Sequence, residues 1–384
     1  MELRDRKQIV FTGSYNQDIL QGTGEIVKGN GSGISVFAFS PADGGMELLH
    51  TYDTPNPSYL EIDSKTKHLY AVNELKEYAG KPSSSVSGFF IEPDFSLRQH
   101  SIAPTGGTDA AHLGLEERSG LLAVANFCSG SVCAYHLDRD GTFGPQTNFF
   151  QHAGSSVDPV RQKSPHAHAI TFSPDGRFLL VPDLGCDEIY VYKVRACGAE
   201  TSLSLDHKVC CAPGAGPRHV VFHPDGTTLY NINELNSTVG VYKFVPDTAE
   251  CALLQTISTV PENHAPSTCS ALKVHPNGKF VYASNRGEDS IAVFAVNSDK
   301  TLRLLEWQKT RGRTPRDFDI SPDGRFLVAA NQDSDSIAVF SIDAEKGTLQ
   351  FVRLNENLRT VTCVKFAAGK DTAAPDETRR GLET

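Results

Sequence analysis

Arginine, histidine and glutamate stand at the two ends of one short segment, GPRHVVFHPDGTTLYNINELNS, which runs from Gly216 to Ser237. Arg218 and His219 precede an apolar run and a Pro-Asp-Gly turn, and Glu234 follows the second apolar run. A hairpin around this turn brings its two ends together, because paired antiparallel strands run in opposite directions. Arginine binds carboxylates and phosphates through two N–H groups, and histidine or glutamate can transfer protons. The segment alone fits two interpretations, an ion pair tying two strands together or part of a site for a small anion.

This hairpin is one copy of a repeated pattern. Similar segments are FSPDGRFLLVPD from Phe172, FHPDGTTLYNIN from Phe222, VHPNGKFVYASN from Val274 and ISPDGRFLVAAN from Ile320. Their turn glycines, Gly176, Gly226, Gly278 and Gly324, are separated by 50, 52 and 46 residues. Each copy continues into two further strand-like runs, and weaker copies begin at Ser58 and His112. Units of four strands at this period are typical of β-propellers.

We therefore predict an all-β fold, a seven-bladed β-propeller with four antiparallel strands in each blade. Six blades are continuous in sequence. The seventh combines the strand VTCVKF from Val361 with three N-terminal strands from Ile9, Gly33 and Met46, so that the two chain ends close the ring. We expect residues 8–367 to form this single domain and the polar residues 369–384 to be a disordered tail.

The repeat predicts which polar side chains meet. The residue eight positions before each turn glycine begins the innermost strand, which lines the central channel of a propeller. These residues are His168, Arg218, Ser270 and Arg316, with His112, Ser58 and Thr362 at the aligned positions of the other blades. The second strand ends beside them, at positions held by Glu74, Phe127, Leu184, Glu234, Arg286 and Gln332. We expect one channel mouth to carry a cluster of arginine, glutamate and histidine side chains.

Composition narrows the class of partner. The formal net charge is −10 and the isoelectric point is near 5.7, which argues against binding to nucleic acid or to a membrane surface. No apolar stretch approaches the roughly 20 residues of a membrane span, and the N-terminus has no signal-peptide core. Nine scattered cysteines, an odd number without a CxxC pair, suggest free thiols. We expect a cytoplasmic protein.

A metal site is the main alternative at this mouth, because His166 and His168 resemble a ligand pair. The neighbouring arginines would repel a cation, and no carboxylate cluster of the calcium type is present. Nucleophile-elbow, dinucleotide-binding and phosphate-loop motifs are also absent from the sequence. We predict no metal and no cofactor.

Three blocks of the chain resemble one known family. GAGPRHVVFHPDGTTLYNINELNSTVGVYKF, HAHAITFSPDGRFLLVPDLG and LKVHPNGKFVYASNRGEDSIAVF are similar to the seven-bladed lactonase family. That family includes bacterial 6-phosphogluconolactonases of the cycloisomerase type and fungal 3-carboxy-cis,cis-muconate lactonizing enzymes. The resemblance implies a metal-free site at the channel mouth, with His168, Arg218, Glu234 and Arg286 as its catalytic residues. Arg316, His112, Glu74 and Ser270 are the expected substrate-binding residues.

The favoured reaction is the hydrolysis of 6-phosphogluconolactone, a small anionic substrate. The arginines would hold the phosphate and polarise the carbonyl, and Glu234 or His168 would activate water while the other protonates the leaving oxygen. A lactone-forming cycloisomerase acting on a carboxylated muconate is the alternative reaction. A non-catalytic interaction propeller is the alternative of another class, although the blades lack the WD dipeptide of common binding propellers. The sequence leaves the oligomeric state open, as well as whether the loops 16–32 and 74–85 cover the site.

Overall fold

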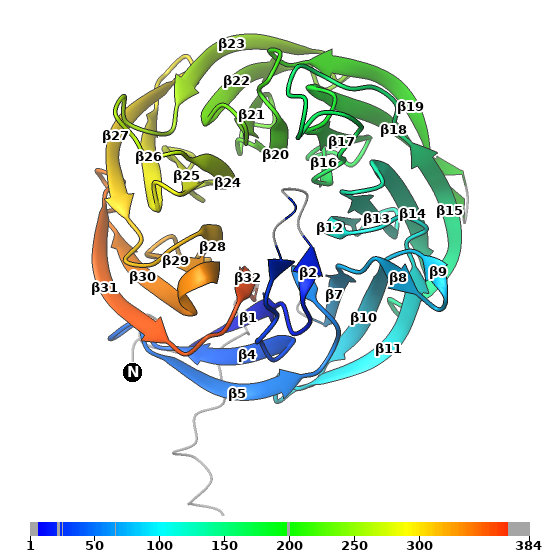
Figure 1. Cartoon of the computed structure of the whole chain (residues 1–384), viewed down its shortest axis with the longest axis horizontal. Helices are drawn as coiled ribbons and strands as arrows, with labels where there is room; N and C mark the ends of the chain where they lie inside the picture. The colour runs from blue at the N-terminus through cyan, green and yellow to red at the C-terminus, as the bar shows by residue number, and fades with distance from the viewer. Residues whose placement is uncertain (1–6, 21–23, 25, 66, 198–199, 368–384) are drawn as a thin grey trace, which may run out of the picture.

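The structure is a computed structural model that describes residues 7–20, 24, 26–65, 67–197 and 200–367, without the side chains of residues 196, 197 and 200. The predicted tail, 369–384, lies outside these residues. Seven four-stranded antiparallel sheets surround a central axis, which confirms the seven-bladed propeller (Figure 1). Two short hairpins lie outside these sheets, β2 (Ile19–Leu20) with β3 (Ile26–Val27) and β8 (Glu77–Tyr78) with β9 (Lys81–Pro82).

Four concentric layers of strands make up the ring. The innermost strands are β6 (Pro57–Ile62), β12 (Ala110–Glu116), β16 (Thr171–Phe172), β20 (Pro217–Phe222), β24 (Thr268–Val274), β28 (Pro315–Ile320) and β32 (Val361–Phe366). The second strands are β7 (His68–Asn73), β13 (Leu121–Asn126), β17 (Phe178–Asp183), β21 (Thr228–Asn233), β25 (Phe280–Arg286), β29 (Phe326–Asn331) and β1 (Gln8–Ser14). The third strands are β10 (Ser85–Ile91), β14 (Ser131–Leu137), β18 (Glu188–Cys197), β22 (Thr238–Phe244), β26 (Ser290–Val296), β30 (Ser336–Ile342) and β4 (Ile34–Phe39). The outermost strands are β11 (Leu97–Pro104), β15 (Phe143–Gln151), β19 (Glu200–Cys210), β23 (Cys251–Ser258), β27 (Leu302–Lys309), β31 (Leu349–Glu356) and β5 (Met46–Tyr52).

The ring closes where the two ends of the chain share a blade. Strand β32 pairs antiparallel with β1, with Val10 opposite Phe366 and Thr12 opposite Val364. Strands β4 and β5 complete this sheet, as the sequence predicted. Because every sheet then packs between two neighbours, its second and third strands are buried on both faces.

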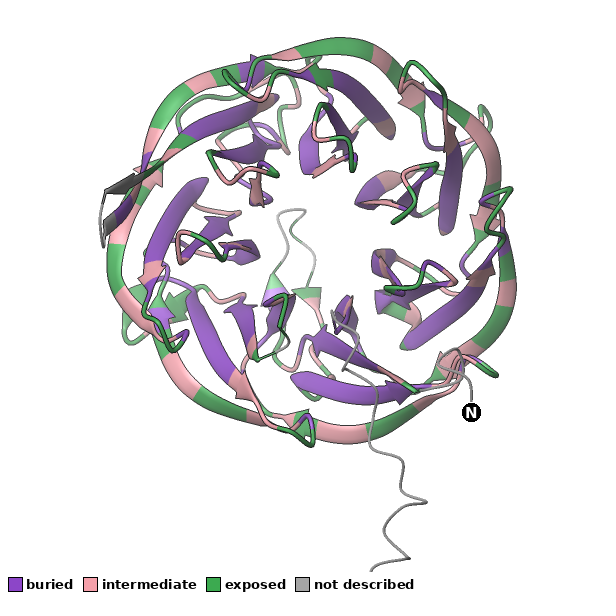
Figure 2. Ribbon diagram, turned by 180° about the vertical axis from the view of Figure 1, so that it is seen from behind, coloured by how far each residue is buried: buried purple, intermediate pink, exposed green. Residues whose placement is uncertain are grey.

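The burial pattern follows these layers (Figure 2). All six residues of β13 are buried, whereas exposed and half-buried residues alternate over much of β23. An outermost strand packs against protein with only one face, so alternation with a period of two is expected there. Within the described ranges, no helix has the length and apolar character needed to cross a membrane.

A β-bulge interrupts the pairing near the start of the innermost strands. In β20, Pro217 pairs with Asn233 and His219 with Ile232, so that Arg218 is the extra residue between them. Arg316 is the extra residue of β28 in the same way. A bulge changes the direction of a side chain relative to regular alternation. The bulges therefore bring these arginines to the channel mouth.

The buried asparagine at or next to the end of a second strand holds the preceding connection in place. Asn285 Nδ2 donates to the backbone oxygen of Thr259 at 2.8 Å, and Asn73 Nδ2 donates to that of Pro55 at 2.8 Å. These bonds satisfy backbone oxygens of the connecting segments, which lie outside the strands. The repeated asparagine thus has a structural role, and the residue after it faces the mouth of the channel in several blades.

Candidate active site

A cavity of about 270 Å³ opens at one mouth of the central channel. Its lining includes six residues that the sequence placed at this mouth, namely His168, Arg218, Glu234, Arg286, Arg316 and Glu74. Leu20 of the β2–β3 hairpin also contributes to the lining. In Figure 1 this hairpin projects toward the centre of the ring, and it belongs to the loop 16–32 singled out above.

Three arginines converge on one carboxylate in this cavity. Glu234 Oε2 lies 3.0 Å from Arg218 Nε and 2.8 Å from Arg286 Nη2. Its other oxygen, Oε1, accepts a hydrogen bond of 2.6 Å from Arg161 Nη2. One negative charge thus neutralises one of three positive charges, and the cluster keeps an excess of two. We call Arg161, Arg218, Arg286 and Glu234 the arginine cluster.

The arginine cluster keeps Glu234 ionised. Burial by itself would raise the pKa of this carboxyl, but the charges of Arg286, Arg161 and Arg218 outweigh it and hold the pKa well below the usual range. Burial and the nearby charge of Arg286 lower the pKa of Arg218 to about 9, and the guanidinium remains protonated at neutral pH. A carboxylate held in this way is a counter-ion and a weak base.

The arginines of the cluster differ in how much hydrogen-bonding capacity is left for a ligand. Arg218 is buried, and besides Glu234 it contacts the backbone oxygen of Ser270 at 2.7 Å and His219 Nε2 at 3.0 Å. The side chains of Arg161 and Arg286 are 19% and 18% exposed, and the buried Nε of Arg286 has no hydrogen-bond partner among the described residues. Arg161 and Arg286 are therefore the groups that can bind an incoming anion.

His168 supplies a neutral imidazole beside this cluster. Burial, followed by the charge of Arg218, lowers the pKa of His168 well below its ordinary value, although Glu234 opposes the shift. The ring packs edge-on against Phe127 and His219, and its Nδ1 has no hydrogen-bond partner within the described part of the chain. A second, much smaller cavity of about 10 Å³ also touches His168, beneath the mouth. A buried histidine of this kind stays neutral near neutral pH, so that one ring nitrogen remains unprotonated.

Glu74 and Arg316 form a second group on the cavity wall. Arg316 Nη2 lies 3.6 Å from Glu74 Oε2, and the guanidinium stands over the ring of Tyr15 at 5.3 Å. The Tyr15 hydroxyl donates a hydrogen bond of 2.7 Å to the same carboxyl oxygen. Tyr15 follows the first strand and was not among the predicted site residues, because a tyrosine after an apolar run is typical of a core residue.

Two predicted substrate-binding residues lie away from the cavity lining. His112 is buried deeper in the channel, where it stacks on Tyr59 at 3.8 Å and lies 5.1 Å from His219. In its blade Ala110 pairs with Asn126 and His112 with Ala125, so that Ala111 takes the place of Arg218. Ser270 is buried in the channel wall, where its hydroxyl bonds the backbone oxygen of Arg316.

The displacement of His112 has a simple cause. Asn126 follows Gly120 by six residues, whereas Asn233 follows Gly226 by seven. The two hairpins have the same length, because Ala110 pairs with Asn126 as Pro217 pairs with Asn233. Gly120 instead lies one position later in its turn than Gly226 does, so that counting back eight residues from Gly120 stops at His112, one residue short of Ala111. Counting back from the terminal asparagine selects Ala111 correctly, because strand pairing depends on this end of the hairpin.

Arg161 is the site residue that the repeat could not identify. It lies in the long connection between β15 and β16, where Asp158 Oδ1 accepts hydrogen bonds from the backbone nitrogens of Val160 and Arg161 at 2.8 and 2.9 Å. The buried Gln162 anchors the same turn through a 2.9 Å bond from its side-chain nitrogen to the backbone oxygen of Leu184. The local signal was the Asp-Pro turn sequence, but nothing in it indicates contact with Glu234.

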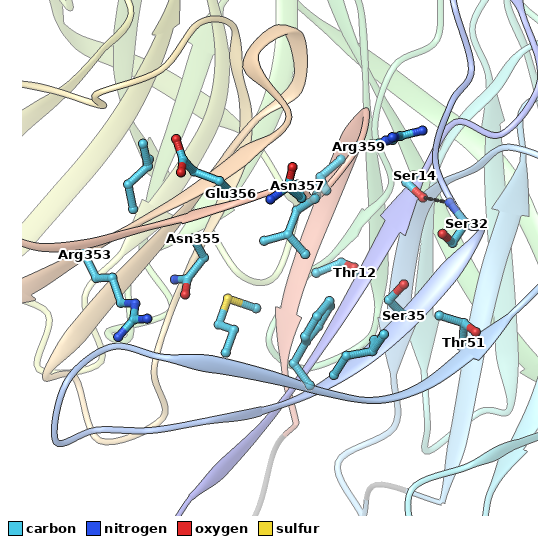
Figure 3. A pocket seen from close by; sticks show the side chains of 16 residues that line it. Thr12, Ser14, Ser32, Ser35, Thr51, Arg353, Asn355, Glu356, Asn357 and Arg359 are labelled. Atoms are coloured by element: carbon cyan, nitrogen blue, oxygen red, sulfur yellow. Dashed lines mark hydrogen bonds between the residues drawn. The ribbon is translucent and has the colours of Figure 1, made fainter.

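A larger hollow of about 520 Å³ lies between neighbouring blades where the ring closes (Figure 3). Figure 3 shows hydroxyl and amide side chains, such as Ser35 and Asn355, spread along its walls. Its lining contains no histidine, and its Arg353 forms a 3.1 Å ion pair with Asp43. Of these two cavities, the channel mouth is the one that combines paired charges with a histidine.

His166 contributes to packing near the site. Its ring stacks on Phe127 at 4.6 Å, and its Nδ1 lies 2.9 Å from the backbone oxygen of that residue. His166 and His168 thus occupy different environments. Within the described residues, no group of three or more histidine, cysteine or acidic side chains is arranged to hold a metal ion.

The fold and this mouth define a class of protein, a β-propeller with an anion-binding, proton-accepting cavity on its axis. The model of a lactonase family described as a seven-bladed β-propeller matches residues 9–366. The chain belongs to this lactonase family.

Similar proteins agree with this placement. A 6-phosphogluconolactonase of Formosa agariphila is 34% identical over 297 residues, which cover 76% of this chain and 82% of the relative. A 6-phosphogluconolactonase of Bacillus subtilis is 30% identical over 316 residues, covering 81% and 87%. The structure of the periplasmic gluconolactonase of Pseudomonas aeruginosa superposes with a TM-score of 0.85 at 30% identity, covering 94% of this chain and 99% of that one.

Proposed function

We propose that this protein hydrolyses a sugar lactone that carries a phosphate group, with 6-phosphogluconolactone as the substrate. The observation that carries the proposal is the charge of the arginine cluster, in which three guanidinium groups share one carboxylate. The two uncompensated positive charges match a phosphomonoester, whose charge near neutral pH is about −1.5 to −2. The relatives named 6-phosphogluconolactonase support the same substrate.

The chemistry follows from the protonation states of the site. Arg161 and Arg286 bind the phosphate, since both are partly exposed and bidentate N–H groups suit phosphate oxygens. His168, as a neutral imidazole, takes a proton from the attacking water. Glu234 acts as the counter-ion that holds the arginines in position, because its carboxylate is already bonded by three guanidinium groups. This assignment replaces the expected role of Glu234 as an acid or base.

The remaining charges of the cavity favour a lactone over a muconate. Glu74, Asp109 and Asp333 line it, with Arg316 at 3.6 Å from Glu74 and Lys76 at 2.6 Å from Asp109. Carboxylate oxygens accept hydrogen bonds from hydroxyl groups, which a sugar lactone carries and a muconate lacks. The cycloisomerase reaction therefore has weaker support than lactone hydrolysis.

A substrate panel tests the proposed reaction. After chelator treatment, we expect the purified protein to hydrolyse 6-phosphogluconolactone with a kcat/KM about 100-fold above that for the lactone without phosphate, which corresponds to about two charge-assisted hydrogen bonds. We expect no turnover of 3-carboxymuconate. The rates are measured by titrating the released acid after subtraction of uncatalysed hydrolysis. Turnover of the muconate alone, or of no lactone at all, would contradict the proposal.

Replacing Arg161 by alanine tests its role in phosphate binding. We expect KM for 6-phosphogluconolactone to rise about 10- to 100-fold with little change in kcat, because a hydrogen bond to a charged group contributes about 1.5–3 kcal/mol. For the lactone without phosphate, KM should rise much less. The matched control is Arg303→Ala, which removes an exposed arginine of the outermost strand β27. Equal losses for both lactones would show that Arg161 does not contact the phosphate.

The cellular location is also a proposal. We infer a cytoplasmic enzyme, since the eight cysteines whose side chains the structure describes form no disulfide. The gluconolactonase of Pseudomonas aeruginosa, by contrast, is named as periplasmic. Fractionation of cells that express the native gene, followed by immunoblotting, distinguishes the two compartments.

A further inference from the structure

Glu74 and Glu234 occupy equivalent positions in two blades but have opposite surroundings. Each follows the asparagine that ends a second strand, Asn73 in β7 and Asn233 in β21. Glu234 has three guanidinium nitrogens at 2.6, 2.8 and 3.0 Å. The guanidinium contact of Glu74 is 3.6 Å, with Arg316. Pairs of carboxyl groups with such different environments commonly divide acid and base roles.

The position of Glu74 is well defined. Its backbone nitrogen donates to the oxygen of Asn56 at 3.0 Å, and its side chain is 12% exposed on the cavity wall. The hydroxyl of the buried Tyr15 donates to Glu74 Oε2 at 2.7 Å. This hydrogen bond holds the carboxyl group in place on the cavity wall.

The groups around Glu74 favour its protonated form compared with an exposed glutamate. Burial raises the pKa of Glu74, and the charge of Asp109 adds to this rise. The positive charge of Arg316 and the hydrogen bond from Tyr15 oppose the shift without cancelling it. Among the described residues, Tyr15 after β1, Asp109 before β12 and Arg316 of β28 are the titratable groups with the largest effects on it.

On the basis of the proposed lactonase activity, we propose that Glu74 is the proton donor to the ring oxygen that leaves, with Tyr15 as its positioning residue. Water loses one proton to His168, and its oxygen bonds to the carbonyl carbon. The bond between that carbon and the ring oxygen then breaks, and the ring oxygen takes the proton of Glu74. The product is a hydroxy acid. The proton on His168 returns to Glu74 through solvent, and the acid releases its own proton.

The test is the pH dependence of kcat for 6-phosphogluconolactone in Glu74→Gln, measured after subtraction of uncatalysed hydrolysis. A proton donor is active below its pKa, so we expect the wild-type rate to fall as pH rises through the pKa of Glu74. Glutamine cannot donate this proton. In the variant, we expect kcat to fall about 100-fold, KM to stay within about threefold, and the alkaline decline to disappear.

Two further variants separate donation from folding. Glu74→Asp keeps an acidic proton and should retain the alkaline decline with a smaller loss of kcat. Tyr15→Phe removes a hydrogen bond that favours the ionised carboxyl, so the decline should move to higher pH. A merely structural role of Tyr15 would not move it. The matched control, Glu77→Gln, changes an exposed glutamate of β8 and should leave the profile unchanged.

Specific outcomes would overturn the assignment. A kcat of Glu74→Gln within about threefold of wild type, or a variant that keeps the alkaline decline, shows that Glu74 is not the donor. If Glu74→Gln fails to fold, the other two variants decide. A Tyr15→Phe profile that does not shift, together with a Glu74→Asp profile without the alkaline decline, shows that Glu74 is not the donor. These results leave the proposed function intact when the wild type hydrolyses the lactone. A wild type that hydrolyses no lactone refutes the proposed function itself.

Discussion

Replacing His168 by glutamine should lower kcat for 6-phosphogluconolactone about 100- to 10,000-fold, which is the range attributed to a general acid or base. Glutamine keeps a polar side chain of similar reach but cannot accept the proton of the attacking water. Because the proposed phosphate site is the arginine cluster and does not include His168, KM should stay within about threefold. Steady-state kinetics of the purified variant, with its melting temperature as a check on folding, measures both quantities.

His166→Gln is the matched control for this change, since it alters a histidine two residues away whose ring packs on Phe127. We expect its kcat within about threefold of wild type. The wild-type rate should also depend on pH with a definite sign. A base is active when unprotonated, and the pKa of His168 is lowered by burial and by Arg218. Activity should therefore persist well below the ordinary histidine pKa and fall only at lower pH. A large loss in His166→Gln with none in His168→Gln would contradict the assignment.

Replacing Glu234 by glutamine should destabilise the fold by about 3–5 kcal/mol, as is typical when one partner of a buried ion pair is removed. The change leaves the charges of Arg161, Arg218 and Arg286 without their shared counter-ion. Hydrolysis of the phosphorylated lactone should also weaken, because these side chains lose the group that orients them. Chemical denaturation of wild type and variant measures the difference in the free energy of unfolding.

The pH dependence of this difference has an expected sign. The folded-state pKa of Glu234 is lowered, so its contribution to stability is present above the unfolded pKa of about 4.3 and is lost as pH falls toward the folded pKa. The wild type and Glu234→Gln should therefore converge in stability in acid. Inorganic phosphate should raise the melting temperature of the variant more than that of wild type, since it supplies the missing negative charge.

Glu92→Gln is the matched control, because Glu92 forms an exposed 2.8 Å pair with Arg98 of an outermost strand. Such a pair contributes at most about 1 kcal/mol. Equal stability losses in Glu92→Gln and Glu234→Gln would show that the arginine cluster has no special dependence on its carboxylate.

The sequence by itself determined the fold and most of the site. The turn glycines Gly176, Gly226, Gly278 and Gly324 all have φ near 70°, a conformation that favours glycine. A repeated glycine therefore marked a repeated turn, and the turn aligned the innermost strands of the blades. That alignment brought Arg218, Glu234 and Arg286 together correctly, because strand pairing carries the register from the turn to the channel mouth.

The tertiary structure alone decided what the repeat does not encode. Arg161 reaches Glu234 from a connection outside the blades, 73 residues away in the chain, and no periodicity predicts such a contact. His112 lies one position deeper because Gly120 stands one position later in its hairpin than Gly226 does, as the pairing of His112 with Ala125 shows. The proposed roles of Glu74 and Glu234 also depend on the tertiary structure. In the proposed mechanism, the same residue at the same repeat position is a counter-ion or a proton donor according to how many charges surround it.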